Sequence, residues 1–435
     1  MNILFGILKT IYFTVWIIFD LAIVLINSAI WIRLSPPASA LLTMPKMIYP
    51  NLVNKAIYGY FGLALVMITV VVLAHLKVIS IRMQTSLLLY LSLAILAAVT
   101  ISSDRYISKL KEAKTEYANP AMKAIPDSTV QVDLKNRKVI DLRDRFISTD
   151  VSPAVFKLYQ PDQKVMMRDV VIYLAYGNWI AAPESMADYF VDAMNEKGYA
   201  AVVFTGQTRR ETDFTGMIQD IREKVAFLRE NSDELGVGRI LLSGGSAGAN
   251  LALTAAYSQS IQEFQDDGLT EEQTKIDGVI AFYPVVDMVY NYHFFTDKTE
   301  EQMDLFDRMG DWLFSLSDPN KAKSIRESHE KVMQNLLGGF PDDENMKRMY
   351  QISSPVCLVD ENASPTLLIH GTHDCMTPIE PTRELFSKLK NSGADVAMLE
   401  LPYTDHAFDA IAPRDSLVTE KVLDSVFEWL AHLQP

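Results

Sequence analysis

A five-residue segment at 244–248, Gly-Gly-Ser-Ala-Gly, most constrains what this 435-residue chain can fold into. It has the pattern Gly-x-Ser-x-Gly, follows the apolar run 239–243 and precedes the helix-prone run 250–256. A serine at such a strand-to-helix turn sits on strained backbone, with its hydroxyl exposed above a helix N-terminus. The glycines let the chain turn sharply without a Cβ clash. Because the pattern also occurs by chance, the surrounding sequence decides whether Ser246 is a nucleophile.

From about residue 129 the chain alternates strand-like and helix-like segments. Most of the strand-like segments are short apolar runs, as expected for parallel strands buried on both faces. Amphipathic helices are predicted between them, for example at 184–197 and 214–231. This alternation predicts an α/β fold in which helices flank a mostly parallel sheet with right-handed crossovers. The predicted strands are 154–159, 170–175, 200–205, 239–243, 278–283, 366–370 and 396–401.

Residues 287–355 interrupt this alternation. They contain no strand-like run, and helical patterns rich in Met, Phe and Tyr occur around 293–316 and 321–337. A helical insertion between two late strands would lie over the carboxyl ends of the strands, where ligands bind in open α/β sheets. We therefore predict a cap over the site; the alternative is a helix pair that only packs on the domain.

Two segments downstream of Ser246 carry partners for a serine nucleophile. An alcohol needs a base to remove its proton, and the base needs an orienting carboxylate. Asp374 follows the strand 366–370, and His406 follows the last strand, so both lie on loops at strand ends. The order Ser, Asp, His is that of α/β-hydrolases. The alternatives are Asp287 as the acid and His370 or His373 as the base.

Further segments occur in a family-like order at 171–174, 235–237, 245–250, 282–285, 337–339, 353–355, 370–374 and 405–406. With these segments, residues 150–430 resemble an α/β-hydrolase of the esterase/lipase type, close to the carboxylesterase and hormone-sensitive-lipase-like branches. The resemblance implies that Ser246 is the nucleophile, that His406 is the general base and acid, and that Asp374 orients His406. It implies neither a cofactor nor a metal.

The segment 175–179, Ala-Tyr-Gly-Asn-Trp, departs from the family pattern, which has His-Gly-Gly-Gly at the oxyanion hole. Gly177 is retained, and Asn178 tolerates left-handed backbone. Their amides and that of Ala247 are the predicted oxyanion hole. In place of a glycine, Tyr176 either narrows the site or supplies a phenol as an extra donor. The predicted substrate-binding residues are Tyr176, Trp179 and Gly245.

Three apolar runs precede this domain, at 3–32, 57–76 and about 86–101. Each is long enough to cross a hydrocarbon core of roughly 30 Å. A cleaved signal peptide is the alternative for the first run, with 38–40 as a cleavage-like site, but the run is long and lacks a basic start. Asp20 within it is predicted to pack between helices or lie near the interface, and a functional polar group is the alternative. We predict a membrane region at 1–103, a connector at 104–128 and a hydrolase domain at 129–435, with the cap at 287–355.

Charge divides along the same boundary. Residues 1–100 hold six basic side chains and one acidic one, whereas the whole chain has a formal net charge of −14. An acidic domain argues against nucleic acid as a partner. Lys and Arg near the spans are more numerous on the side that carries the large domain, which predicts a cytoplasmic domain. The two cysteines, Cys357 and Cys375, are expected to be free thiols.

Together these features predict a membrane-anchored serine hydrolase that cleaves carboxylic esters. Small-molecule or lipid esters are the expected substrates, since membrane attachment brings amphipathic esters within reach. Two alternatives stay open at this point. The acyl-enzyme could transfer its acyl group to an acceptor other than water, or the altered loop at 175–179 could belong to a non-catalytic binding protein.

Overall fold

All seven strands predicted from the sequence occur in the structure, a computed structural model. It describes residues 14–24, 58–60, 62–72, 83–119, 134, 137–143, 155–161, 167–206, 213–265, 268–303, 308, 311–312, 324–409 and 416–433. Six strands run parallel in the order β7-β4-β8-β9-β10-β11. The predicted mostly parallel sheet is thus confirmed. Their bounds are β4 Arg168–Leu174, β7 Ala200–Thr205, β8 Val237–Gly245, β9 Gly278–Phe282, β10 Thr366–Gly371 and β11 Val396–Leu401.

Antiparallel strands complete both edges of this sheet. At one edge, β3 (Val155–Gln160) pairs with β7 and β2 (Lys138–Asp141) pairs with β3. At the other edge, the short β1 (Thr115–Tyr117) pairs with β11. The sequence indicated β3 but neither β1 nor β2. Both edge strands are short and contain no buried residue, so they lack the apolar run that marks a buried strand.

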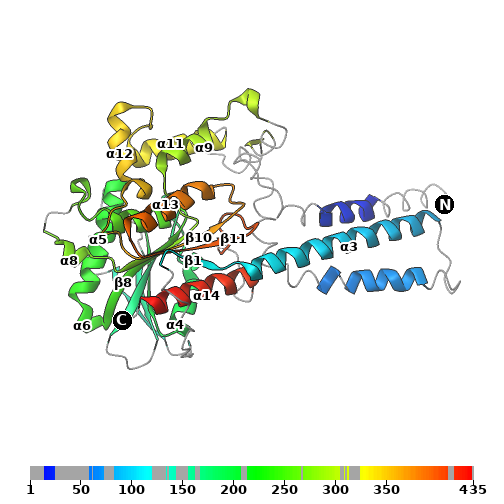
Figure 1. Cartoon of the computed structure of the whole chain (residues 1–435), viewed down its shortest axis with the longest axis horizontal. Helices are drawn as coiled ribbons and strands as arrows, with labels where there is room; N and C mark the ends of the chain where they lie inside the picture. Colours follow the sequence, from blue (N-terminus) through cyan, green and yellow to red (C-terminus); the bar gives the residue numbers. More distant parts are fainter. Residues whose placement is uncertain are drawn as a thin grey trace.

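Helices cover both faces of the sheet (Figure 1). On one face, α4 (Asp188–Glu196), α14 (Leu417–His432) and the end of α3 share a core with the strands. On the other face, α5 (Phe214–Glu230), α7 (Ala247–Tyr257) and α13 (Ile379–Ser392) do so. The shorter helices are η3 Glu184–Ala187, α6 Ser232–Leu235, η4 Gln262–Phe264 and α8 Glu271–Thr274.

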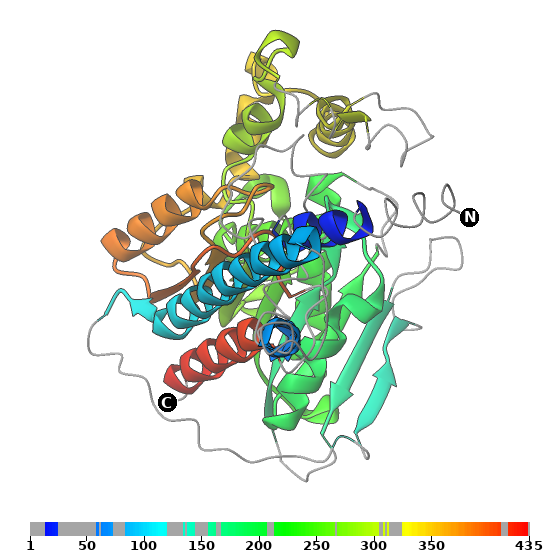
Figure 2. The same ribbon diagram turned by 90° about the vertical axis from the view of Figure 1, so that its right-hand side faces the viewer.

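A long helix, α3 (Met83–Glu112), joins the N-terminal region to the domain. Its last turns lie against α14 (Figure 1 and Figure 2), and Tyr106 and Leu110 are buried there. The Tyr106 hydroxyl lies 3.2 Å from Oγ1 of Thr404, on the loop that carries His406. The chain then enters β1. The predicted connector at 104–128 therefore contains the end of α3 and an edge strand of the sheet.

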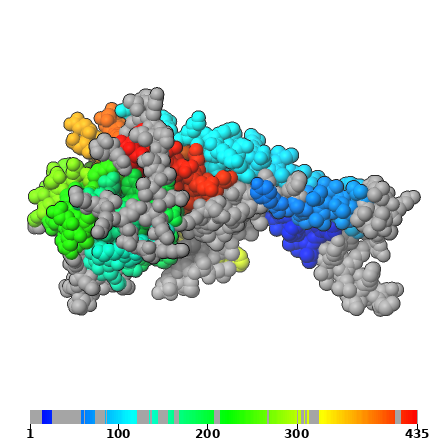
Figure 3. All heavy atoms as spheres, turned by 90° about the horizontal axis from the view of Figure 1, so that it is seen from below, coloured from blue at the N-terminus to red at the C-terminus, as the bar shows by residue number. Residues whose placement is uncertain are grey.

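Two helices beside α3, at 14–24 and 58–72, pack on it through Ile23, Met67 and Leu96. They extend away from the domain (Figure 3). In the described part of the chain, one helix, Leu87–Glu112, is long and apolar enough to cross a membrane by length and composition. It contains most of the third predicted span. The first two predicted spans lie partly outside the described residues.

Asp20 makes a polar contact between two of these helices. It accepts a 2.5 Å hydrogen bond from the Ser92 hydroxyl of α3, and the Trp16 indole donates to the same hydroxyl over 2.8 Å. Asp20 is 6% exposed. A buried carboxylate is costly unless it is hydrogen-bonded, so Ser92 compensates part of that cost. Among the interpretations of Asp20, this contact favours helix packing.

Between β9 and β10 the described residues form helices and no strand, as the sequence predicts. Aspartate and serine side chains cap the two longest of them: Asp287 accepts from the Tyr290 amide and Ser324 from the Glu327 amide. Figure 1 shows α9, α11 and α12 together beyond one edge of the sheet. The helices of this segment are α9 Met288–Thr296, η5 Glu300–Gln302, α11 Ile325–Leu337, η6 Glu344–Met346, α12 Lys347–Ile352 and η7 Pro355–Cys357.

Candidate active site

Ser246 lies at the turn between β8 and α7, as the sequence predicts. Its φ is 55° and its ψ is −118°, outside the regions that residues with a Cβ favour. The backbone amide of Ser246 donates to the Phe282 carbonyl over 2.9 Å and its carbonyl accepts from Asn250 over 3.0 Å, so neighbouring backbone holds the strained turn. Such strain persists only where the surroundings over-determine it, and it is common at functional sites.

The glycines around Ser246 are required by close packing. A Cβ on Gly248 would lie 2.2 Å from the Leu174 carbonyl oxygen at the end of β4. A Cβ on Gly244 would lie 2.7 Å from the backbone of Gly248 itself. The start of α7 therefore packs directly on the sheet, which fixes the Ser246 side chain above the strand ends.

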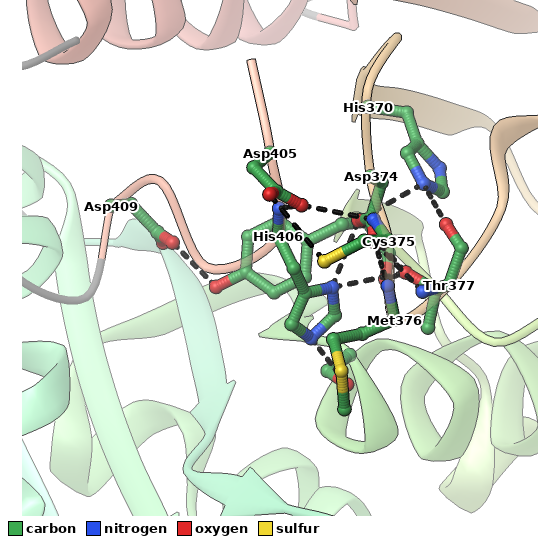
Figure 4. Close-up of polar contacts among 10 residues, drawn as sticks. His370, Asp374, Cys375, Met376, Thr377, Asp405, His406 and Asp409 are labelled. Carbon is green, nitrogen blue, oxygen red and sulfur yellow. Dashed lines mark hydrogen bonds and ion pairs between the residues drawn. The ribbon is translucent and has the colours of Figure 1, made fainter. Parts of the chain in front are cut away.

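His406 and Asp374 approach Ser246 from the two loops that the sequence singled out. The Nε2 atom of His406 lies 3.1 Å from Oγ of Ser246, and its Nδ1 atom lies 2.8 Å from Oδ2 of Asp374. Figure 4 shows Asp374, Thr377 and His406 turned toward one another. The three side chains thus form a continuous hydrogen-bonded series from a hydroxyl through an imidazole to a carboxylate.

Hydrogen bonds fix the carboxylate of Asp374. Its Oδ1 accepts from the amides of Met376 and Thr377 at 2.9 and 2.7 Å, and its Oδ2 accepts from the Thr377 hydroxyl at 2.9 Å. Burial alone would raise the pKa of this carboxyl, but the adjacent His406 and hydrogen bonds from His370 and His406 hold it well below its usual range. Asp374 is therefore ionised beside the imidazole.

The contact between Asp374 and His406 raises the pKa of the imidazole, whereas it lowers that of the carboxyl. Burial disfavours the protonation of His406, yet the charge of Asp374 and their hydrogen bond raise the pKa of the imidazole above its ordinary value. An imidazole with this partner is a stronger base toward the Ser246 proton. The arrangement can therefore take a proton from the hydroxyl and hold the resulting positive charge.

The alternative residues have other roles in the structure. Asp287 caps α9, where it accepts from the Tyr290 amide over 2.9 Å. His373 contacts the Thr372 hydroxyl and the Tyr403 ring. His370 lies beneath Asp374, with its Nε2 2.7 Å from the Thr377 carbonyl and 3.4 Å from Oδ2 of Asp374. None of the three hydrogen-bonds to Ser246 in the part of the chain that the structure describes.

The loop at 175–179 forms a small hairpin of β5 (Tyr176–Gly177) and β6 (Ile180–Ala181), with Asn178 and Trp179 at positive φ. The Trp179 indole donates to Oδ1 of Asn250 over 2.9 Å, and the Asn250 amide donates to the carbonyls of Val285 and Ser353. The bond between Trp179 and Asn250 ties the hairpin to α7. This support could not be predicted from the sequence.

The Tyr176 phenol donates to the Gly206 carbonyl. The phenol is therefore used within the protein and does not serve as an extra donor toward the substrate, which was one of the two possibilities for Tyr176. Its ring still lines the site.

A cavity of about 500 Å³ opens above Ser246. All of the sequence-predicted site residues except Asp374 and Ala247 line it; those two are buried directly beneath it. Five residues of α9 and α11 also line the cavity: Asn291, Phe295, Ile325, Ser328 and His329. The part of the cavity that they line is called its cap end, and these two helices therefore do more than pack on the domain.

Sequence reasoning missed two supports near the imidazole. The Tyr283 ring packs edge-on against His406 at 4.6 Å, and its hydroxyl donates to the buried Asp409, which also accepts from Tyr189. Thr377, three residues after Asp374, binds the carboxylate as described above. A hydroxyl residue three positions from an aspartate on a strand-end loop is the one local pattern that could have indicated such support.

The sheet order and the flanking helices define the class of the protein: it has the α/β-hydrolase fold. The chain belongs to the BD-FAE family, whose model matches residues 156–389. Similar proteins include the esterase LipC of Mycobacterium tuberculosis, 23% identical over 64% of this chain and 62% of LipC. The probable carboxylic ester hydrolase LipM of the same organism is 24% identical over 59% of this chain and 54% of LipM. The chain thus spans little more than half the length of these relatives.

Among solved structures, an esterase from the Planctomycetes species Thermogutta terrifontis superposes with a TM-score of 0.48 and 18% identity. That superposition covers 69% of this chain and 93% of the esterase.

Proposed function

We propose that this chain is a membrane-anchored serine hydrolase that cleaves carboxylic esters through an acyl-enzyme on Ser246. The observation that carries the proposal is the series from Oγ of Ser246 through His406 to Asp374 at the base of the cavity. The names of the esterase relatives support the same reaction class.

In the first half of the reaction, Nε2 of His406 takes the Ser246 proton while Oγ attacks the ester carbonyl. The negative charge on the carbonyl oxygen is held by backbone amides of Gly177, Asn178 and Ala247. Ala247 opens α7, where the first amides have no partner within the helix. The protonated His406 then gives its proton to the leaving alkoxide, and the alcohol departs.

In the second half, water loses a proton to His406 and attacks the acyl carbonyl of the Ser246 ester. Collapse of this intermediate returns the proton from His406 to Oγ of Ser246 and releases the carboxylic acid. Asp374 stays ionised throughout and keeps the Nδ1–H tautomer of His406 in place.

The test of this proposal is covalent labelling of the purified, detergent-solubilised chain by a fluorophosphonate. We expect one equivalent of label attached to Ser246, together with hydrolysis of short p-nitrophenyl esters that releases free acid. A folded chain that takes up no label, or carries it on another residue, contradicts the proposal. Acyl transfer to an added alcohol in preference to water would instead identify an acyltransferase.

The membrane anchor is part of the same proposal. Apolar side chains on the helices at 14–24, 58–72 and 83–101 face outward: Val15, Ile18, Leu65, Val66, Leu87 and Ile101 are each more than half exposed. Exposed apolar side chains gathered on packed helices in this way are typical of a membrane or protein contact. Because these helices largely coincide with the three predicted spans, we assign their exposed apolar surface to lipid. The larger number of Lys and Arg near the spans on the side of the large domain favours the cytoplasm for the catalytic domain.

We expect the full chain to stay in the membrane pellet after an alkaline carbonate wash and to be released by non-ionic detergent. An impermeant maleimide should modify the exposed Cys357 only after cells are opened. The buried Cys375 is the internal control and should react only on denaturation. Release by carbonate contradicts the anchor, and labelling of Cys357 in intact cells contradicts the cytoplasmic side.

A further inference from the structure

Most polar atoms around the cavity are already bonded to protein partners. The Tyr176 hydroxyl donates to Gly206, the Tyr283 hydroxyl to Asp409, and the Trp179 indole to Asn250. The Thr377 hydroxyl is held by Asp374. These groups shape the site near Ser246, and none of the four can donate a hydrogen bond to a substrate without giving up the protein partner to which it donates.

The cap end of the cavity differs. His329 of α11 lines the cavity and is 6% exposed, and its ring stacks on Phe295 of α9 at 4.5 Å. Its Nε2 atom is buried and has no hydrogen-bond partner among the residues that the structure describes. Among the described residues with such an unpaired buried side-chain atom, His329 alone lines the cavity. Asn291 and Ser328 lie at the same end.

A buried polar atom without a partner costs about 1–3 kcal/mol. A ligand that supplies the missing hydrogen bond removes this free-energy cost. A purely hydrocarbon substrate has no group to pair with Nε2 of His329, so the cost remains. We therefore propose that the cap end of the cavity is a subsite for a hydroxyl group of the ester substrate, with His329 as its hydrogen-bond partner. This subsite rests on the proposed esterase function and defines its substrate class: apolar esters that carry a hydroxyl remote from the scissile carbonyl.

The charge state of His329 favours a neutral ligand group over an ionised one. Burial lowers the pKa of His329 to about 4, so the imidazole is neutral near pH 7 and offers no positive charge to a carboxylate or phosphate. A hydroxyl can donate to or accept from either tautomer of a neutral imidazole. The apolar neighbours Phe295 and Ile325 leave room for the hydrocarbon part of the same molecule.

The test compares matched esters in the full, detergent-solubilised chain. Each pair has the same length and differs by one terminal hydroxyl, either on the acyl chain (p-nitrophenyl ω-hydroxyalkanoates against alkanoates) or on the alcohol (glycol monoesters against alkyl esters). We expect kcat/KM to favour the hydroxylated member of at least one pair by about tenfold, the worth of one neutral hydrogen bond. The His329→Phe variant, which keeps the ring stack, should abolish that ratio.

His293→Phe is the matched control, because His293 lies on α9 outside the cavity and contacts Asp297. It should keep the wild-type ratio. If His329→Phe does not fold, His329→Met is used in its place. Fluorophosphonate labelling separates the two proposals: a wild type that does not label contradicts the esterase function. A wild type that labels but shows no hydroxyl preference, or a preference that survives loss of His329, overturns the subsite alone.

Discussion

We expect the Ser246→Ala variant to lose about five to six orders of magnitude in kcat for ester hydrolysis and all fluorophosphonate labelling. Without Oγ no acyl-enzyme can form, and His406 has no proton to take. The oxyanion amides and the cavity remain, so any residual rate comes from binding and charge stabilisation alone. The measurement is the initial rate on a p-nitrophenyl ester at saturating concentration, with thermal unfolding to show that the variant folds.

Ser243→Ala is the matched control for this variant. Ser243 lies three residues earlier on β8 and is fully buried, and within the described part of the chain its hydroxyl has no hydrogen-bond partner. Removing an unpaired buried hydroxyl should leave stability nearly unchanged or slightly increased, and activity should stay near that of the wild type. If Ser246→Ala keeps its activity or its label, another residue is the nucleophile.

The central strands were predictable because a strand buried on both faces has a continuous run of apolar residues in the sequence. The bounds predicted for β7 and β11 match the structure, and all residues of β7 are buried. The edge strands β1 and β2 lie half in solvent and include charged residues such as Glu116 and Lys138, so hydropathy does not distinguish them from loops. The antiparallel direction of β3 depends on its partner β7, which local sequence does not specify.

The segment after residue 103 was predicted as a charged, helix-prone connector, but its continuity with the third apolar run in one helix, α3, was not predicted. Hydropathy falls after residue 101, where charged side chains begin, and the third span was predicted to end there. The helix continues to Glu112 because tertiary packing buries Tyr106 and Leu110 against the domain. Packing of one helical stripe is enough to sustain a helix whose other side is charged.

The candidate site was predictable in its three central residues, whereas of their supports only Thr377 has a local pattern in the sequence. Ser246, Asp374 and His406 each lie within five residues of the end of a buried strand, and parallel strands bring their carboxyl ends to one edge of a sheet. The other supports arise from contacts across long sequence separations. Trp179 and Asn250 are 71 positions apart, and Tyr283 and Asp409 are 126 apart. Such pairs leave no spacing pattern in a single sequence.

We expect the Asp374→Asn variant to lose about four orders of magnitude in kcat/KM. The Oδ1 atom, which accepts from the amides of Met376 and Thr377, remains an oxygen, so the loop keeps its shape. The change falls on Oδ2, which becomes an amide that donates to Nδ1 of His406. That bond favours the tautomer with its proton on Nε2, which cannot accept the proton of Ser246.

The pH dependence gives a second readout of the same variant. His406 must be unprotonated to act as a base, so in the wild type kcat/KM should fall as pH drops through its raised pKa, above about 6.5. Without the charge of Asp374, this acid limb should move to lower pH.

Asp287→Asn is the matched control for Asp374→Asn, because asparagine also caps helices and Asp287 was the alternative acid. It should change activity by less than threefold and leave the acid limb in place. A large loss in Asp287→Asn, with Asp374→Asn still active, would transfer the acid role to Asp287. Because Asp287 is occupied by the Tyr290 amide while Asp374 contacts His406 directly, we expect the large loss in Asp374→Asn.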